Sequence, residues 1–528
     1  MPEGSATTQP SVTASAHVPD ACEIELKLLT DASTLARLVD APVISRNATS
    51  KGVVRRLEAT YYDTSAAEIA GLGASLRVRR SGKQHIQTLK LATPANPLQR
   101  QELEAPVPDM APQLDILPTS DLGAPFETLQ SADLIAIFTT RIRRHTRTVT
   151  FGGAVIEVAF DEGLLIAGER TEAVCEIELE LKSGEVGALY ELALSLLEHG
   201  PLRVGTQSKG ERGYALAFGT PPLAQKGFSS GIEPSDTTDE VIARTLAACQ
   251  RHVMANLVAA QHGQDPEGVH QLRVALRRLR TAISLFGREI PASSLQALVF
   301  TARRLASGLG PARNWDVFLT TTVAEIESRQ LPGIEFTDLK STSGPFRERG
   351  YEAARADLID LECTRFLLSL GRVIERRSWR NDISSEALAV LTQPAREFAD
   401  RALARLNRKA LKQGHHFRRL APEARHELRL TLKKLRYAAE FFLPLYEDDG
   451  VVQKYLKRLS RLQNILGADN DATTTQSLLR EVEASTSNPQ VHKAIGAITG
   501  WQGRDNIEAA RALRQTWQQF IDAEPFWH

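Results

Sequence analysis

The pattern of apolar and polar positions divides the 528-residue chain into two parts of different texture. Between residues 21 and 216, short segments alternate apolar and polar residues with a period of two, as half-buried β-strands do. We expect strands at 22–29, 53–62, 75–80, 84–91, 100–105, 145–150, 154–160 and 174–182. Helical periodicity predicts helices near 31–40, 129–138 and 185–199. Many short strands favour a barrel or sandwich over a parallel α/β sheet.

The second part of the chain is rich in Leu, Ala and Arg at helical spacing and has almost no strand pattern. A segment of Pro, Gly, Ser and acidic residues precedes it, and we interpret residues 218–236 as a linker. We expect the stretch "LPGIEFTDLKSTSGPFRERG" (331–350) to break the helical region near its middle. The first 20 residues contain neither a basic nor an apolar run, which predicts a disordered tail instead of a signal peptide.

The helical region repeats internally. "VHQLRVALRRLRTAISLF" (269–286) aligns with "RHELRLTLKKLRYAAEFF" (425–442), and "LASGLG" (305–310) aligns with "LQNILG" (462–467). The two alignments are separated by 156 and 157 residues, which indicates a duplicated unit. The expected organisation is a tail (1–20), a β-rich domain (21–217), the linker (218–236) and a helical domain (237–528) with repeats at about 237–345 and 383–525.

The composition shows an uneven distribution of charge along the chain and indicates the cellular compartment of the protein. Residues 1–220 contain 21 Lys and Arg against 28 Asp and Glu, whereas the remainder contains 43 against 36. The basic excess in the second part predicts an anionic partner. The four cysteines show no metal-binding spacing, which is typical of buried thiols in a reducing compartment. No run of roughly 18 apolar residues predicts a membrane span, so we expect no membrane partner and a cytoplasmic location.

The sequence "CEIEL" occurs twice, at residues 22–26 and 175–179. Because successive side chains of a strand point to opposite faces, both copies place Cys, Ile and Leu on one face. The other face carries Glu23, Glu25 and Lys27 in the first copy. In the second copy it carries Glu176, Glu178 and Glu180. The same strand-like face therefore presents carboxylates twice.

Other segments also place charged residues at alternate positions. They contain Arg77 and Arg79, Lys90, Arg100, Glu102 and Glu104, Arg141, Arg143 and Arg144, Glu157 and Asp161, and Lys209 and Arg212. One interpretation is a set of solvated strand faces with cross-strand ion pairs. The other is a closed barrel whose lumen is charged, with carboxylates for Mg²⁺ or Mn²⁺ and basic residues for phosphate oxygens. The scarcity of Thr, Ser and Gln at these positions favours the second interpretation.

The ordered motifs "EIELK", "LRVR", "TLK", "RQELE", "FDEG", "EIELE" and "SKGERGY" resemble the CYTH family of triphosphate tunnel metalloenzymes. The resemblance implies an eight-stranded antiparallel β-barrel with flanking helices, whose tunnel binds a triphosphate and a divalent cation. It implies catalytic roles for Glu23, Glu25 and Lys27. The implied metal ligands are Glu23, Glu25, Asp161, Glu176, Glu178 and Glu180. The implied phosphate ligands are Lys27, Arg77, Arg79, Lys90, Arg144, Lys209 and Arg212, with Arg144 the best fit within 141–144.

The repeated helix carries a basic stripe beside its apolar face. At about 100° per residue, Arg273, Arg277 and Arg280 lie within about 80° of His270, apart from the leucines that would pack. The second copy repeats this with His426, Arg429, Lys433 and Arg436. A basic stripe can be a solvated face, but these stripes have little interleaved Glu to relieve repulsion.

This region resembles the CHAD domain, a duplicated helical module associated with inorganic polyphosphate. The resemblance implies two four-helix units whose basic helices line one groove, and the histidines would be phosphate contacts or packing residues more readily than metal ligands. Neighbouring helices would add Arg303, Arg304, Lys454, Lys457 and Arg458.

The sequence thus predicts a metal-dependent inorganic triphosphatase barrel joined to an all-α polyphosphate-binding domain. An adenylate cyclase, or a thiamine or nucleoside triphosphatase of the same fold, stays open as an alternative. So does a non-catalytic polyphosphate-binding protein. Nucleic acid is the less favoured polyanion, because no aromatic residues interleave with the basic stripes to stack bases.

Overall fold

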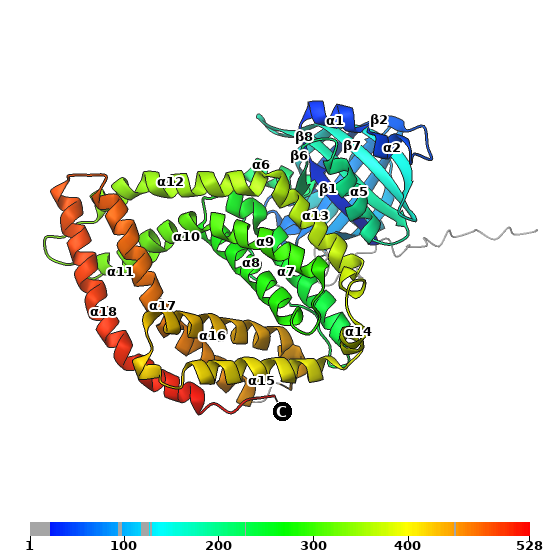
Figure 1. The fold of residues 1–528 in the computed structure, drawn as a ribbon. Helices are drawn as coiled ribbons and strands as arrows, with labels where there is room; N and C mark the ends of the chain where they lie inside the picture. The colour runs from blue at the N-terminus through cyan, green and yellow to red at the C-terminus, as the bar shows by residue number, and fades with distance from the viewer. Residues whose placement is uncertain are drawn as a thin grey trace, which may run out of the picture.

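The computed structural model of the chain describes residues 22–92, 98–117, 126, 129–227, 229–447 and 450–527. Its N-terminal part is a closed antiparallel barrel (Figure 1). The strands are β1 (Cys22–Leu29), β2 (Val53–Asp63), β3 (Ala74–Ser81), β4 (Gln84–Ala92), β5 (Gln99–Val107), β6 (Ile135–Phe151), β7 (Ala154–Ala167) and β8 (Arg170–Ser183). Their order is β5-β4-β3-β2-β6-β7-β8-β1, and β1 pairs with β5 to close the sheet. The predicted eight-stranded barrel is confirmed, and a short β9 (Arg203–Gly205) adds to the outside of β1.

The first half of β6 contradicts the helix that we expected at 129–138. A single 3-10 turn (Ser131–Asp133) precedes β6, which then pairs with β2 and β7 along its length. The segment "IAIFTT" is rich in β-branched residues, and Phe138, Thr140 and Ile142 are buried at a period of two. Over so short a window the helical and strand periods are hard to separate, and the two neighbouring strands decide the outcome.

Apolar residues of the barrel face outward, where short helices cover them. Helices α1 (Ala32–Leu38), α2 (Pro42–Ser45) and α5 (Gly187–Leu197) form one core with β1, β7 and β8. Leu26 and Leu28 of β1 and Ile177 and Leu179 of β8 are buried in that core. Because strand side chains alternate, the charged residues between them point into the lumen. The apolar face of the repeated "CEIEL" strand is therefore the outer face of the barrel.

Helix α6 (Lys209–Phe218) closes one end of the barrel, and no helix was expected there. It begins with a capping box between Ser208 and Glu211. Tyr214 of α6 packs edge-on against Phe138, with ring centroids 5.4 Å apart. Another short helix, α3 (Glu68–Gly71), connects β2 and β3.

The second part of the chain is helical, as predicted. It contains α7 (Thr238–His262), α8 (Pro266–Phe286), α9 (Ser293–Gly308), α10 (Gly310–Val317), α11 (Ala324–Glu327), α12 (Thr337–Ile359), α13 (Leu361–Glu375), α14 (Ser385–Leu391), α15 (Ala395–Gln413), α16 (Pro422–Phe442), α17 (Gly450–Glu483) and α18 (Pro489–Ile521). The duplicated segments form α8 and α16, which have the same length of 21 residues. Phe286, Phe398 and Phe442 from both repeats meet in one continuous core.

The break that we expected at 331–350 is confined to its first residues. Helix α12 runs through the remainder and contains Pro345 in its interior. Leu339, Ser343, Tyr351 and Ala354 are buried along α12. Tertiary packing on this face therefore outweighs the local cost of a proline and two glycines.

Helix α13 joins the two domains (Figure 1), where it packs against α5 of the barrel. Leu368 of α13 is 0% exposed and belongs to the core of the barrel domain. At Gly371 a Cβ atom would lie 2.1 Å from the ring of Tyr190, so this position requires glycine. Arg365 and Arg376 add ion pairs to barrel glutamates at either end of the contact.

Candidate functional site

The barrel encloses a cavity of about 200 Å³ that we call the tunnel. All eight barrel strands contribute to its wall, and the first residues of α6 close it. Seven lining residues are basic and seven are acidic. Ten of the predicted site residues line it: Glu23, Glu25, Lys27, Arg77, Arg79, Lys90, Arg144, Glu178, Glu180 and Lys209.

Strand register places three tunnel carboxylates side by side. Glu25 of β1 is the Cα partner of Glu180 of β8, and Glu180 is the Cα partner of Glu157 of β7. Together with Glu23 they form what we call the acidic row. Like charges opposite one another on neighbouring strands are destabilising. Burial raises the pKa of Glu180, and Glu23 and Glu157 raise it further although Lys182 opposes them.

The facing wall carries cations from β3, β4 and β5. Arg79 lies 3.8 Å from Glu104, Arg100 lies 3.5 Å from Glu25, and Lys90 pairs with Glu102. The Nε atom of Arg77 is buried and has no hydrogen-bond partner among the residues that the structure describes. Burial and then the charge of Arg77 lower the pKa of Lys90 to about 8. These groups are crowded by like charges, so an anion between them would relieve repulsion.

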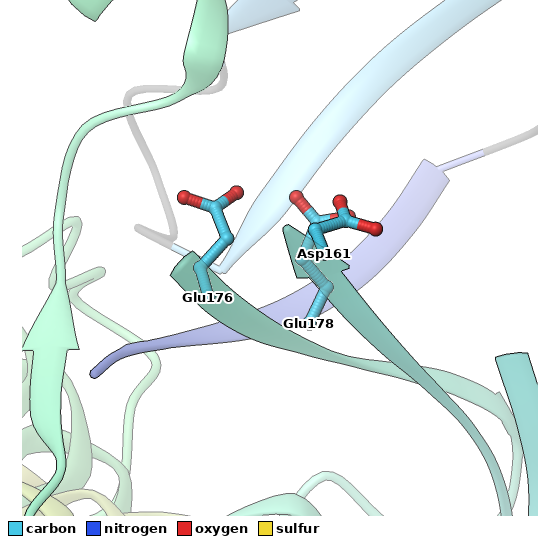
Figure 2. Close-up of side chains that lie close together, drawn as sticks. All are labelled: Asp161, Glu176 and Glu178. Atoms are coloured by element: carbon cyan, nitrogen blue, oxygen red, sulfur yellow. The ribbon is translucent and has the colours of Figure 1, made fainter. Parts of the chain in front are cut away.

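A second layer of carboxylates lies deeper, toward α6. Figure 2 shows Asp161, which belongs to β7, beside Glu176 and Glu178, which belong to β8, and their oxygens lie within 4.8 Å of one another. Lys209 reaches all three, at 2.7 Å from Asp161 and 2.9 Å from Glu178 and closer still to Glu176. Lys27 also pairs with Glu176, at 3.1 Å, and with Glu178. Asp161 and Glu176 lie beneath the tunnel wall rather than on it.

The deep carboxylates and their basic partners hold one another charged. Burial alone would raise the pKa of Glu178, but Lys209, Lys27 and Arg144 lower it well below its usual range. Burial alone would lower the pKa of Lys209, yet Asp161 and Glu176 raise it. Buried charges are tolerated when they are paired in this way.

Two arginines of the predicted set take different positions. Arg144 projects into the tunnel and binds Asp161 in bidentate fashion at 2.6 and 2.7 Å, while Arg141 and Arg143 are exposed on the outer face. Of the arginines between 141 and 144, Arg144 is thus the one that faces the tunnel, a choice that the sequence left ambiguous. Arg212 does not line the tunnel: it reaches Glu176 from outside at 3.0 Å and also binds Glu172. The guanidinium of Arg212 lies behind the tunnel wall, so Arg212 can act on the site by holding the carboxylate of Glu176 in position.

Sequence reasoning left several tunnel residues without a role. Arg100, Glu102, Glu104, Glu157 and Tyr61 all line the cavity. The period of two in "RQELE" pointed to the β5 residues, and only strand register could reveal that Glu157 adjoins Glu180. Tyr61 carries no charge, so the alternation of charged residues could not indicate it. Its ring stacks on Phe138 with ring centroids 4.3 Å apart.

The deep layer is the one group of three described carboxylates whose oxygens lie within 4.8 Å of one another, and it differs from the acidic row in how far cations compensate it. Carboxylate oxygens are the ligands that Mg²⁺ and Mn²⁺ prefer. The deep layer satisfies the same chemistry, but four basic side chains already compensate its three carboxylates. In the acidic row, Glu25 and Glu180 face one another and have less cationic compensation. A cation there would offset the negative charge of Glu23 and Glu157, which adds to the effect of burial in raising the pKa of Glu180.

In the helical domain, basic residues of both repeats meet near α8 and α16. Arg277 donates to the hydroxyl of Tyr437 at 2.8 Å, across the two helices. Burial, then Arg277 and Arg313, lower the pKa of Arg273 to about 10. Burial, then Lys409 and Arg280, lower the pKa of Lys434. The dominant charged neighbours of these groups are therefore other cations.

The predicted helical-domain residues differ in their surroundings. His426, Arg303, Lys454 and Lys457 are exposed, whereas Arg304, Arg429, Lys433 and Arg458 are partly buried. Arg436 pairs with Glu440 at 3.1 Å, and Arg280 has Arg303 as a charged neighbour. Burial and Arg313 lower the pKa of His270, so this histidine is neutral at neutral pH. Arg313, Lys409 and Lys434 were not predicted, and only the folded arrangement brings them to this region.

The fold and the site define a charged antiparallel tunnel followed by a helical domain. Residues 21–214 match the family model described as the CYTH domain, and residues 244–480 match that described as the CHAD domain. The chain therefore carries a CYTH domain followed by a CHAD domain.

Three relatives put this assignment in context. Over 166 residues the chain is 34% identical to an inorganic triphosphatase of Haemophilus influenzae, and the match covers 30% of this chain and 45% of that protein. The chain thus spans less than half of the length of this curated relative. It is 25% identical over 469 residues to an uncharacterised protein of Mycobacterium tuberculosis, covering 81% and 86% of the two chains. The crystal structure of the CHAD domain from the plant Ricinus communis is 27% identical with a TM-score of 0.47, and covers 58% of this chain and 99% of that one.

No helix in the described part of the chain combines the length and apolarity needed to cross a membrane. The described cysteines are free thiols, with Cys249 and Cys363 buried and Cys175 partly buried. Cys22 lies at the start of β1, and its side chain is outside the described residues.

Proposed function

We propose that the barrel hydrolyses inorganic triphosphate to diphosphate and phosphate with Mg²⁺ or Mn²⁺ as cofactor. The observation that carries the proposal is the acidic row facing Arg77, Arg79 and Lys90 across the tunnel. Carboxylates on one wall suit a divalent cation and guanidiniums on the other suit phosphoryl oxygens. The volume of about 200 Å³ favours a bare phosphate chain, since pockets for larger organic ligands are roughly 300–1,000 Å³.

Charge balance supports a cofactor. The tunnel lining carries equal numbers of acidic and basic side chains, so a highly charged triphosphate entering alone would find no net attraction. When bound, the cation would neutralise phosphate charge and lower the pKa of a bound water. Glu25 and Glu180 would hold it, and Glu23 and Glu157 would complete the ligand set.

The remaining tunnel residues would position the substrate. Arg77 and Arg79 would bind phosphoryl oxygens with bidentate geometry. Lys27 pairs with two deep carboxylates and would offer its third N–H to the inner end of the phosphate chain, whereas Lys209 already pairs with three and would act through its charge. Phosphoryl transfer depends on this kind of positioning and charge neutralisation more than on covalent chemistry.

The test is a comparison of substrates and variants. Purified protein should release phosphate from tripolyphosphate in the presence of Mg²⁺ or Mn²⁺ and lose this activity with a chelator. ATP and long-chain polyphosphate should be poorer substrates. Glu25→Gln and Glu180→Gln should each abolish turnover, because an amide is a weak neutral ligand for a hard cation. Glu162→Gln, on the exposed outer face of β7, is the matched control and should keep full activity. Full activity in both tunnel variants would overturn the proposal.

We further propose that the helical domain binds inorganic polyphosphate. Support comes from the mutual repulsion near α8 and α16, where the charged neighbours of Arg273, Arg280 and Lys434 are mainly cations. Like charges held together lower stability, and a polyanion would remove that cost.

A further inference from the structure

A groove of about 570 Å³ lies between α9 and α13, outside the tunnel and away from the basic stripes of α8 and α16. Figure 1 shows α13 passing from the helical domain to the barrel, with α9 beside it. The side of α13 that faces the groove carries Arg365, Ser369, Arg372 and Arg376. At roughly 100° per residue these four positions fall within about 60° of arc, so they form one stripe.

The three arginines of this stripe are not equivalent. Arg365 lies 2.7 Å from Glu198 and Arg376 lies 2.9 Å from Glu191, both glutamates of the barrel domain. Arg372 lies between them and is exposed, and its guanidinium makes no hydrogen bond or ion pair within the described ranges of the chain. The domain contact thus fixes the outer two guanidiniums and leaves the middle one available. Arginines held in place by neighbours lose little further freedom when a ligand binds.

The opposite wall supplies a hydroxyl without a partner. The Oγ atom of Ser294 on α9 is buried and has no hydrogen-bond partner among the described residues. A buried polar atom that is left without a hydrogen-bond partner is destabilising. An acceptor oxygen in the groove would satisfy this donor, and Thr301 and Ser369 place two more hydroxyls along the same walls.

We propose that this groove binds a short inorganic phosphate chain, either diphosphate or triphosphate. Phosphoryl oxygens accept the paired N–H groups of guanidinium, and terminal phosphates also accept from hydroxyls. Arg372 and Arg376 are separated by about 6 Å of helix rise, so one chain of two or three phosphates reaches both. A single carboxylate would engage only one of them.

The groove's charge selects a short chain over a long one. Glu362 and Glu198 pair with Arg365, and Glu191 and Glu185 pair with Arg376, so Arg372 is the one guanidinium of the stripe without an acidic partner among the described residues. A long polyanion gains most from an extended basic surface, such as the one near α8 and α16. The choice of chain length rests on the proposed function, because the barrel would consume triphosphate and release diphosphate.

The experiment measures protection of individual arginines in the unmodified full-length protein. Phenylglyoxal reacts with accessible guanidinium groups, and mass spectrometry of the digest gives a rate for each site. Tripolyphosphate or diphosphate at about ten times its Kd should slow the modification of Arg372 roughly tenfold, because only unoccupied sites react. Arg288, exposed and outside both sites, is the matched control. Arg77 reports tunnel occupancy in the same digest.

Protection of Arg372 without protection of Arg288 would support the groove. Modification of Arg372 at an unchanged rate, under conditions that protect Arg77, would overturn this inference and leave the tunnel proposal intact. Equal protection of Arg372 and Arg288 would also overturn it, because the effect would then be non-specific. A failure to protect Arg77 would count against the proposed function instead.

Discussion

The domain contact yields the sharpest prediction about stability. Leu368 belongs to the helical domain by sequence but is 0% exposed in the core of the barrel domain. Leu368→Ala should therefore destabilise the barrel, although the substitution lies 185 residues beyond Ser183, where β8 ends. Leu361→Ala on the same helix is the matched control, because Leu361 is 43% exposed.

The magnitude follows from burial. Truncating a buried leucine removes its transfer free energy and leaves a cavity that closes only in part. Such substitutions cost about 2–5 kcal/mol, whereas surface substitutions usually stay within about 0.5 kcal/mol. The ring of Tyr190 and the ion pairs of Arg376 fix both sides of the site, so we expect little relaxation.

Hydrogen exchange can localise this loss. All five tryptophans lie in the helical domain, so intrinsic fluorescence would not follow barrel unfolding. Peptides from α5 and β8 should instead lose protection by roughly 30-fold or more in Leu368→Ala, the equivalent of about 2 kcal/mol. They should keep it in Leu361→Ala. Unchanged protection of α5 and β8 in Leu368→Ala would refute the view that α13 completes the barrel core.

Three further predictions concern the two candidate sites. Arg77→Ala and Arg79→Ala should each lower kcat/KM by the equivalent of roughly 1.5–3 kcal/mol, and lysine at either position should restore it only in part. Arg143→Ala, at an exposed position, is the control and should leave kcat/KM unchanged. Unaltered kcat/KM in both tunnel variants would show that these arginines are structural. Because the pKa of Lys90 is lowered to about 8, its charge is present below that pH and lost above it, so kcat/KM should fall as pH rises through about 8. Lys90→Arg should move that decline to higher pH, and an identical profile would exclude Lys90 as its cause. In full-length protein, long-chain polyphosphate should bind with steep salt dependence, and a quadruple alanine variant should bind more weakly with a flatter slope and unchanged helix content. Its four positions are Arg273, Arg277, Arg429 and Lys433. Parental affinity and slope in that variant would show that the stripes are ordinary solvated faces.

The barrel was predictable because its strands obey one rule along their length. In β1 and β8, apolar residues pack outward on α5 and charged residues alternate with them, so a period of two is visible in the sequence. Helix α6 is different, since a run of ten residues with two glycines and three charged residues has a weak hydrophobic periodicity. Its one local signal was the Ser208–Glu211 capping box, which the sequence does contain. The length of α12 could not be predicted from its local sequence, because tertiary packing stabilises the helix despite Pro345 in its interior.

The sequence predicted which side chains face the lumen, but not whether they lie in the acidic row or in the deep layer. Alternation correctly indicated that Glu25, Glu180 and Lys27 share the lumen. Alternation says nothing about height along the barrel, which depends on strand register. Register separates Glu180, in the acidic row, from Glu176, which is buried among lysines only four residues earlier. The same limitation left Glu157, one of the alternating charged residues, without a specific role, and it placed Arg212 in the tunnel although Arg212 is not among the residues that line the cavity.

The tunnel is divided into two layers that differ in how far their charges are compensated. In the deep layer, Lys27 and Lys209 compensate the carboxylates so fully that the pKa of Glu178 falls well below its usual range. Removing one partner from such a buried network is costly, which keeps the lysines in fixed positions. In the acidic row, burial raises the pKa of Glu180, and its neighbours Glu23 and Glu157 raise it further although Lys182 opposes them. A cation bound by the acidic row and a polyanion bound by the facing arginines would offset each other's charge, so we expect most of the binding free energy in the outer layer. The ion pairs of the deep layer hold its side chains in place, and the outer layer is where we expect the cation and the phosphate chain to bind.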